Sequence, residues 1–581
     1  MSILRVANCS GFFGDRLSAA REQVEGGPID VLTGDWLAEL TMGVLAKQRA
    51  RDPDAGYAPS FLAQLEQVLG TCLERGIRIV SNAGGLNPAG CAQAVEQLAA
   101  RLGVTPRVAC VTGDDATERL RQDGSLETEP LVANAYLGCW GIVDALEAGA
   151  DVVITGRVSD ASIVVGPAAW RFGWARDDWD ALAGAVAAGH VIECGAQATG
   201  GNYAFFRELP GLERCGFPIA EIAADGSATI TKHPGTGGAV TVETVTAQLL
   251  YEIDGPSYAS PDVLARFDTL MLEQEAPDRV RIWGTRGEPA PEQVKVGAIL
   301  SGGWRNAVTF GLTGLDIPAK AALAEKTVWR AIEGGRAAFD DVDVRLLGAD
   351  RPDPKTVHEA SALLDLVVAT TDRTLADRFS RAAVETVLAG YPGLYLTGPP
   401  ARATEIAVFW PTLLPAADFP QQVTLDGASW TVELSVVPTQ SRLPTAPPSG
   451  EERLSVVPTQ APSSDGATVR IPLGELAGAR SGDKGGNATL GVWARTDETY
   501  AWLVRFLTAE RIEELIPEAA GCEIRPWALP NLCSLGFTIV GFLGRGVAAN
   551  LKLDAQAKGL GEYLRAKHVD APATLVAQPE R

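Results

Sequence analysis

The stretch that decides the fold class is GIRIVSNAGGLNPAGCAQAVEQLAARLG, from Gly76 to Gly103. It begins with an apolar run, breaks at a glycine turn, and continues with apolar residues at helical spacing. The next apolar run, PRVACVTGDD (106–115), starts soon after this helix ends. Such alternation of strand and helix is typical of a parallel sheet. We therefore expect an α/β fold with a large, mostly parallel sheet covered by helices.

The same rhythm extends outward through the first 250 residues, for example in VDALEAGADVVITGR (143–157). Between Val294 and Trp430 the pattern is weaker. Helical periodicity there is clearest in AALAEKTVWRAIEGG (321–335) and TLADRFSRAAVETVLAG (374–390). We expect this part to be the second half of the large domain.

Composition divides the chain into three parts. Residues 1–437 are predicted to form the large α/β domain, with two sub-lobes as one option, and residues 468–581 a small α+β domain. Residues 438–467 are rich in Pro, Ser, Thr and Gly and are predicted to be a linker. The heptapeptide LSVVPTQ occurs at 434–440 and again at 454–460. Two copies are too few for a repeat architecture.

Charge and cysteine usage restrict the function classes. The 581 residues include 50 Lys and Arg against 72 Asp and Glu, a net charge of −22 that repels phosphate backbones and anionic lipids. We expect no nucleic-acid or membrane partner and a cytoplasmic location, because the first residues do not resemble a signal peptide. The nine cysteines form no CxxC pair, and the four histidines lack metal-ligand spacing. We predict no metal ligands, although Mg²⁺ is not excluded.

Polar, glycine-rich loops follow several of the expected strands. In open α/β sheets, ligands bind at the carboxyl ends of the strands. The first such loop contains Asn82, Gly84 and Gly85, and it precedes a helix whose free N–H groups could hold a carboxylate or phosphate. A tight structural turn is the alternative.

The loop TGRVSD places Thr155, Arg157 and Asp160 directly after a buried-looking strand. The guanidinium group of Arg157 suits a carboxylate or phosphate, and Asp160 could orient it or transfer a proton. The alternative is that the two residues only form a structural salt bridge.

A third loop carries Thr199, Gly200, Gly201 and Asn202, whose backbone could form an anion-binding nest. Cys194 lies just before it, but the adjacent carboxylate would raise its pKa. We therefore favour a structural thiol over a nucleophile.

The loop KHPGTGG combines Lys232, His233, Gly235, Thr236 and Gly237. Histidine titrates near neutral pH, so we predict that His233 is the acid/base residue, with Lys232 as its cationic neighbour. The alternative is a histidine that caps a loop.

The small domain contributes Arg480, Ser481, Asp483 and Lys484 on the loop ARSGDKGGN. The loop does not fit the phosphate-loop pattern GxxxxGK[ST]. We predict that these residues complete a site formed by another domain or subunit, and a structural hairpin or docking loop is the alternative.

Together these stretches resemble the acyclic terpene utilisation (AtuA) family. The motifs are LTGDWLAELTM, NAGGLNP, TGRVSDAS, ECGAQATGGN, KHPGTGG and PDRVRIWG, followed by ELAGARSGDKGGNATLGV and RPWALPNLCSLGFTI. The resemblance implies a large AtuA domain followed by a ferredoxin-like domain, and a role in acyclic terpene or branched acyl-CoA metabolism.

Two functions follow from the resemblance and the polar loops. The first is an enzyme, a hydratase or lyase acting on an acyl-CoA or branched acid by acid/base chemistry, with no certain cofactor and a CoA thioester as a candidate substrate. The second is a non-catalytic subunit or scaffold associated with an acyl-CoA carboxylase or related enzyme. In both cases we expect a small anionic ligand and a homo-oligomer. An ATP-dependent ligase is disfavoured because the phosphate-loop pattern is absent from the sequence.

Overall fold

The computed structural model describes residues 2–124, 126, 128–432 and 467–576. These residues form two compact units. The first comprises Met1–Ile299, Trp410–Leu543 and Gln556–Arg581, and the second comprises Leu300–Phe409 and Gly544–Ala555. The predicted linker (438–467), except Ala467, and the LSVVPTQ repeat lie outside the described residues.

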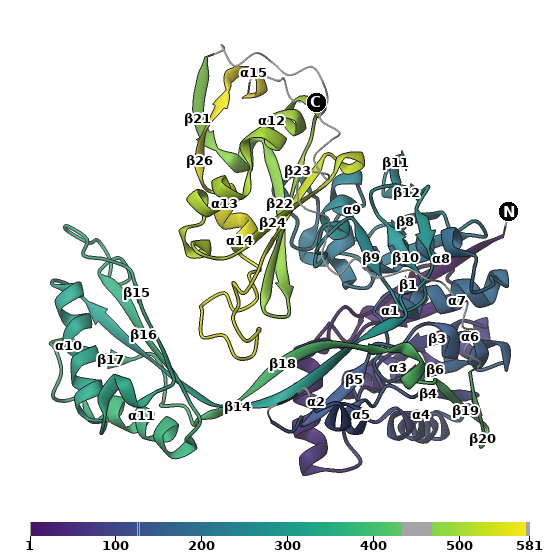
Figure 1. Cartoon of the computed structure of the whole chain (residues 1–581), viewed down its shortest axis with the longest axis horizontal. Coiled ribbons are helices and arrows are strands. Elements are labelled where there is room, and N and C mark those ends of the chain that lie inside the picture. The colour runs from purple at the N-terminus through teal and green to yellow at the C-terminus, as the bar shows by residue number, and fades with distance from the viewer. Residues whose placement is uncertain (1, 125, 127, 433–466, 577–581) are drawn as a thin grey trace. The chain divides into compact units, whose positions relative to one another are not determined.

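The first unit is built on an eleven-stranded sheet in the order β11-β12-β8-β7-β1-β2-β3-β6-β4-β19-β20 (Figure 1). The strands are β1 (Ile3–Asn8), β2 (Val31–Gly34), β3 (Arg78–Ser81), β4 (Val108–Thr112), β6 (Val152–Thr155), β7 (Pro218–Ala223), β8 (Ala228–Lys232), β11 (Met271–Ala276), β12 (Arg279–Trp283), β19 (Gln422–Leu425) and β20 (Ala428–Thr431). Only β1, β2, β3, β6 and β4 pair in parallel. The other six strands pair antiparallel.

The prediction of a mostly parallel sheet is therefore wrong, because the sheet is mixed. Its antiparallel flanks are hairpins closed by short turns, which need no crossover helix. Asp225–Gly226 closes the β7–β8 turn, and Asp426–Gly427 closes the β19–β20 turn, where both residues have positive φ. An Asp-Gly dipeptide between strands is a hairpin signal that the sequence does contain.

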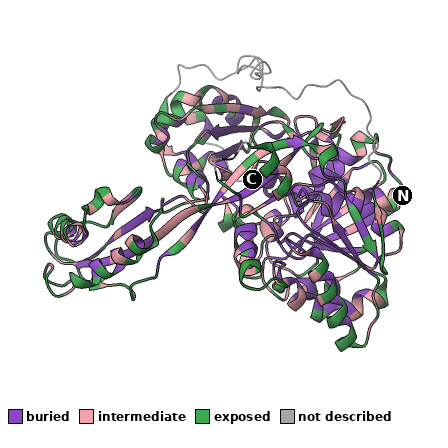
Figure 2. Cartoon of the chain, turned by 60° about the horizontal axis from the view of Figure 1, so that its bottom comes forward, coloured by how far each residue is buried: buried purple, intermediate pink, exposed green. Residues whose placement is uncertain are grey.

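Helices cover both faces of the parallel strands. Those on one face are α1 (Ala19–Gly26), α3 (Pro59–Arg75) and α4 (Pro88–Leu102), and those on the other are α6 (Trp140–Glu147), α7 (Ser162–Phe172) and α8 (Trp179–Ile192). The core under the first group contains Leu32, Leu65, Ile79 and Val95, all buried. Figure 2 shows that buried residues make up most of the strands of this unit. Further elements of this unit are α2 (Glu39–Arg51), α5 (Thr117–Asp123), β5 (Val132–Ala135), α9 (Val242–Leu249), β9 (Ser257–Ala259), β10 (Leu264–Arg266) and β13 (Arg286–Glu288).

The stretch from Gly76 to Gly103 folds as expected, because local signals agree at each point. β3 is buried and ends at Ser81. The side chain of Asn87 accepts a hydrogen bond from Gly90 N, and Pro88 occupies the first turn of α4, where a missing N–H is tolerated. The helix ends at Gly103, whose φ of 73° is readily adopted only by glycine.

The small domain (467–543 and 556–576 of the first unit) has a four-stranded antiparallel sheet in the order β22-β23-β25-β24. Its elements are β21 (Thr468–Pro472), β22 (Ala477–Lys484), β23 (Asn487–Ala494), α12 (Asp497–Phe506), α13 (Ala509–Leu515), β24 (Ile524–Leu529), β25 (Ser534–Ile539), α14 (Leu560–Arg565), β26 (His568–Pro572) and α15 (Ala573–Val576). Apolar side chains such as Leu490 and Phe537 form a core with the helices.

The opposite face of this small sheet is rich in glycine, and α9 and the residues after it pack against it. A Cβ added to Gly491 would lie 2.7 Å from Leu250 Cβ, and one added to Gly482 would lie 2.7 Å from Tyr251 Cε2. Side chains at these positions would push the small domain away from the large one. The β22–β23 hairpin therefore contacts the large domain, as one of the alternative interpretations proposed.

The second unit is an antiparallel sheet in the order β15-β16-β14-β17, with two helices on one face. Its elements are β14 (Gln293–Thr313), α10 (Ile317–Arg330), β15 (Asp341–Leu347), β16 (Ser361–Thr370), α11 (Arg373–Glu385), β17 (Tyr395–Leu396) and β18 (Thr404–Pro415). The first residues of β14 belong to the first unit, where they pair with β5. Among the described residues, no helix is both long enough and apolar enough to cross a membrane.

Candidate functional site

The candidate site is centred on Arg157, which follows β6 at the carboxyl end of the parallel strands. Its guanidinium group is buried, lies 2.8 Å from Asp160 Oδ1, and donates to Leu37 O at 3.0 Å. It also stacks on the Tyr136 ring at 4.1 Å. Burial opposes the charge of Arg157, but Asp160 and other neighbouring anionic groups outweigh it and raise the arginine pKa.

A second cation, Lys295 at the start of β14, lies beside the first. Its Nζ is 3.2 Å from Glu39 Oε1 and 4.5 Å from the Tyr136 ring centroid. Burial works against ionisation of Glu39, but Lys295 and Arg157 more than offset it and lower the Glu39 pKa to about 2. Glu39 is therefore a permanent anion that balances one of the two cations.

Two carboxyl groups near these cations, those of Asp35 and Asp160, have a raised pKa. Asp35 follows β2, is buried, and accepts a hydrogen bond from Asn82 Nδ2 at 2.5 Å. Burial and then Asp160 raise its pKa well above the ordinary value. Burial also raises the pKa of Asp160 despite Arg157, although the Asp160 side chain keeps 30% of its exposure.

Asp114 fixes the loop from the other side. It follows β4 and accepts hydrogen bonds from the Arg157 backbone N–H and from Asn134 Nδ2, both at 2.8 Å. Burial outweighs these donors and raises its pKa to about 6. Gly156 is necessary at this point, because a Cβ there would lie 2.4 Å from Asp114 Oδ1.

The end of α8 adds a histidine and a glutamate. His190 Nδ1 lies 3.1 Å from Glu193 Oε1, and both residues are buried. Burial and then Lys484 lower the pKa of His190 to about 4. Burial, Asp160 and Glu252 raise the pKa of Glu193 well above its usual value, so burial disfavours the charged form of both groups.

The small domain supplies another charged group next to these residues. Lys558 Nζ lies 2.9 Å from Glu252 Oε1 and 3.3 Å from Asp483 Oδ1, and it donates to the Tyr251 hydroxyl. Burial and Glu252 raise the pKa of Asp483 to about 6. Glu252, which pairs with Lys558, also raises the pKa of Asp160 and Glu193.

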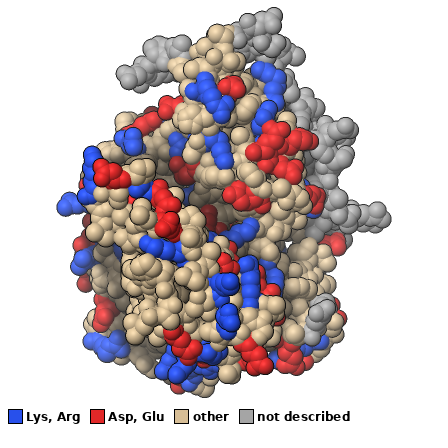
Figure 3. Space-filling model, turned by 90° about the vertical axis from the view of Figure 1, so that its left-hand side faces the viewer, with Lys and Arg blue, Asp and Glu red and all other residues tan. Residues whose placement is uncertain are grey.

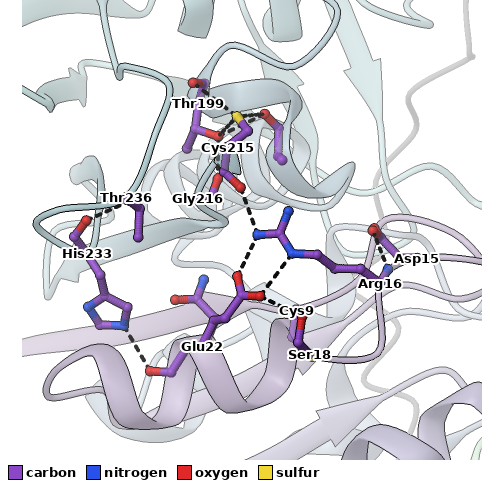
Figure 4. A network of polar contacts seen from close by, with 12 residues as sticks. Cys9, Asp15, Arg16, Ser18, Glu22, Thr199, Cys215, Gly216, His233 and Thr236 are labelled. Carbon is purple, nitrogen blue, oxygen red and sulfur yellow. Dashed lines mark hydrogen bonds and ion pairs between the residues drawn. The ribbon is translucent and has the colours of Figure 1, made fainter. Parts of the chain in front are cut away.

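His233, predicted as catalytic, lies in a separate network with Thr236 (Figure 4), and Lys232, also predicted as catalytic, is next to it in the chain. Lys232 Nζ is 3.0 Å from Asp278 Oδ2 and donates to Thr236 O at 2.9 Å. His233 Nε2 is 2.8 Å from Gln23 O, and its ring lies against the end of α1, where a Cβ on Gly26 would be 2.5 Å from it. This arrangement matches the loop-capping alternative, and the structure does not bring these residues to Arg157 and Asp160.

The other residues of the KHPGTGG loop also make structural contacts. Thr236 Oγ1 donates to His233 O at 2.7 Å. Gly237 packs on the backbone of Gly211, and Gly235 adopts a positive φ in the turn. No contact joins them to the charged site among the described residues.

The remaining predicted loops are largely occupied by internal contacts. Gly84 packs on Thr155 O, and Gly85 has positive φ beside Leu45. Thr199 donates to Ala196 O at 2.8 Å. Asn202, at positive φ, follows Gly200 and Gly201, and its carbonyl oxygen accepts a hydrogen bond from Arg480.

The small-domain residues differ in their surroundings. Asp483 belongs to the charged site, Arg480 stacks on the Tyr251 ring at 4.3 Å, and Lys484 donates to Glu252 O at 3.1 Å. Ser481 accepts from Gly561 N and so holds α14. Ser481 Oγ also donates to Lys558 O at 3.2 Å, so all four predicted residues contact this region.

Several residues of the site escaped sequence reasoning, namely Asp35, Glu39, Asp114, Lys295 and Lys558. Asp35 and Asp114 follow strands directly, a signal that the sequence did contain. Lys295 and Lys558 lie far along the chain in segments without a glycine-rich loop. Charge at the surface gives no further guide, because Lys and Arg are interspersed with Asp and Glu on the face in Figure 3.

The comparison with known families agrees with this architecture. A family model described as acyclic terpene utilisation family protein AtuA matches residues 4–425. The chain belongs to the AtuA family. A second model, the AtuA ferredoxin-like domain, matches residues 471–570, so the AtuA domain order predicted from the motifs is confirmed. No curated protein and no solved structure matches the chain.

The acidic groups of this AtuA-family chain do not form a metal-binding group in the part of the chain that the structure describes. Asp35, Asp114, Asp160 and Glu193 are instead held by hydrogen bonds, ion pairs or protonation. The arrangement places two cations, each paired with a carboxylate, beside carboxyl groups whose pKa is raised by burial.

Proposed function

We propose that this chain is an enzyme of acyclic terpene or branched-chain acyl-CoA and carboxylic acid metabolism that carries out hydratase- or lyase-type acid/base chemistry. The observation that carries the proposal is the Arg157–Asp160 and Lys295–Glu39 ion pairs together with carboxyl groups of raised pKa, namely Asp35, Asp160 and Glu193. Perturbed carboxyl groups next to cations at the carboxyl edge of a sheet are typical of catalytic sites.

The residues have complementary chemical abilities. A carboxylate or thioester carbonyl placed against Arg157 and Lys295 would gain negative charge as a proton leaves the adjacent carbon, and the two cations would stabilise that charge. Asp160 is the group that moves the proton, because it lies 2.8 Å from Arg157 and keeps partial exposure. In a hydration, the base takes a proton from water while an acid returns one to carbon, so that water adds across the double bond.

The ligand class follows from charge compensation. Glu39 and Asp160 already balance the two cations, so an incoming anion can bind only if one carboxyl group takes up a proton or moves. Asp35, Asp160 and Glu193 have the raised pKa that makes uptake favourable. The proposed ligand is accordingly a small carboxylate or a CoA thioester, and the predicted homo-oligomer and cytoplasmic location belong to the same proposal.

The test uses two matched aspartates, each paired with one basic residue. Purified wild-type protein, Asp160→Asn and Asp278→Asn are incubated with branched enoyl-CoA, hydroxyacyl-CoA and the free acids, and products are identified by mass spectrometry. We expect turnover by wild type and Asp278→Asn, and a loss of about 10²–10⁴-fold in Asp160→Asn.

The alternative function is a non-catalytic subunit that docks with an acyl-CoA carboxylase or related enzyme. It is supported if wild-type protein turns over no substrate of the panel but binds such an enzyme stably in a pull-down. Equal activity of Asp160→Asn and wild type would contradict the proposed role of Asp160.

A further inference from the structure

A small cavity lies under the end of β2, between this strand, β3, α1 and α3. It measures about 10 Å³ as the space open to the centre of a water-sized sphere. Its lining is mostly apolar and includes Cys9, Phe61 and Leu65. None of the charged residues of the proposed site lines it, so the cavity is separate from that site.

Three buried polar side chains line the same cavity, and one atom of each has no hydrogen-bond partner among the described residues. These atoms are Thr33 Oγ1, Trp36 Nε1 and Gln64 Oε1. The three residues are only 1% or 2% exposed. Leaving a buried donor or acceptor unpaired is unfavourable, and three such atoms around one cavity indicate a common polar ligand.

The chemistry of the three atoms identifies the ligand. The Trp36 indole can only donate, the Gln64 carbonyl oxygen can only accept, and the Thr33 hydroxyl can do either. A water molecule can donate two hydrogen bonds and accept two, and a cavity of this size holds about one. We propose that a single ordered water binds here, accepting from Trp36 and donating to Gln64, with Thr33 as its third partner.

This water would fix the turn that carries Asp35. Thr33 and Trp36 flank Asp35 in sequence, and the Trp36 backbone N–H donates to Asn82 Oδ1 at 2.9 Å. Asn82 in turn holds the Asp35 carboxyl. The water therefore acts as a positioning element behind the charged site, whether or not that site is catalytic.

The test observes the indole of Trp36 directly. The full-length protein is labelled with ¹⁵N at its 13 tryptophan indoles, and the Trp36 signal is assigned by its loss in Trp36→Phe. We expect a cross-relaxation peak between Trp36 Nε1–H and a long-lived water. In Thr33→Val, which removes the hydroxyl at nearly constant shape, this peak should weaken and the indole proton signal should shift, whereas Thr33→Ser should keep both.

A crystal structure supplies the second readout, with electron density expected within about 2.7–3.2 Å of all three atoms. A resolved Trp36 indole signal without a water peak, or an unchanged spectrum in Thr33→Val, would overturn the proposal. So would a cavity without density in a crystal that shows ordered water elsewhere in the core. Neither readout depends on enzymatic activity, so this inference and the proposed function can fail separately.

Discussion

Two glycine-rich loops look alike in the sequence and differ in the folded chain. TGRVSD (155–160) and KHPGTGG (232–238) both follow a strand and both carry a basic residue. Arg157 lies among Asp160, Asp35 and Glu39, and all three change its pKa or have their own changed by it. Lys232 has one carboxylate partner, Asp278, whose side chain is 37% exposed.

The difference shows that local composition identifies a candidate loop but not a functional site. What distinguishes the first loop is the number of buried and partly buried ionisable groups that converge on it from β2, β4, α2 and β14. Convergence changes protonation, because each buried carboxyl group is influenced by several others. The second loop carries a histidine and a lysine, which sequence reasoning favours for catalysis, but fewer ionisable groups surround it.

The largest effect is expected for Arg157→Met. This change leaves Asp160 and its buried neighbours without their main cation, so the free energy of unfolding should fall by about 3–5 kcal/mol. The midpoint of urea unfolding measures it. If Arg157→Met lowers the free energy of unfolding no more than Lys232→Met does, the two loops do not differ as proposed.

The next effect is a pH dependence caused by Asp114. Its folded pKa of about 6 lies above the unfolded value of 3.8, so the folded state binds the proton more tightly. Relative to Asp114→Asn, wild type should therefore lose roughly 3 kcal/mol of stability as pH rises from 3.8 to 6, and nothing further above pH 6. Unfolding of both proteins at a series of pH values gives this difference. A constant difference would show that Asp114 is ionised like an ordinary aspartate.

A smaller effect is expected where the small domain meets Tyr251. In Gly482→Ala the new methyl group would lie 2.7 Å from Tyr251 Cε2 and 3.3 Å from Lys558 Nζ. The strain should lower stability by about 1–3 kcal/mol. Gly398→Ala is the control, because no atom lies within 4 Å of its added Cβ. Thermal unfolding of both variants measures the effect, and equal midpoints would mean that the domains do not pack closely at Tyr251.

The smallest effect is expected for Lys232→Met. Asp278 can be hydrated once its partner is lost, so the change should lower stability by less than about 1 kcal/mol. Urea unfolding beside Arg157→Met provides the comparison. A loss of several kcal/mol would show that the KHPGTGG loop is as strongly coupled as the Arg157 loop.

Much of the fold could be read from the sequence because its signals are local. The run ending at Ser81, the Asn87–Pro88 helix start and Gly103 lie within one segment, and each acts on its neighbours. The antiparallel flanks were missed although Asp225–Gly226 and Asp426–Gly427 mark their turns. Alternating strands and helices predict the parallel strands in the middle of a sheet, but they do not predict the direction of strands added at its edges.

The candidate site was only partly predictable, because sequence signals are local and the site joins distant segments. Arg157 and Asp160 were found because they share one loop after one strand. Lys295 and Lys558 reach the site from segments more than a hundred residues away, and no local pattern records that approach. For His233, sequence reasoning recognised a titratable side chain but could not show that its ring packs against Gly26.

The most direct test of the account compares two lysines, Lys295 and Lys232, that each form an ion pair with a carboxylate. Binding of a medium-chain branched acyl-CoA is measured by isothermal titration for wild type, Lys295→Met and Lys232→Met. We predict at least tenfold weaker binding for Lys295→Met, about 1.4 kcal/mol, and unchanged binding for Lys232→Met. Weaker binding in Lys232→Met with unchanged binding in Lys295→Met would contradict the assignment of the site to the Arg157 loop.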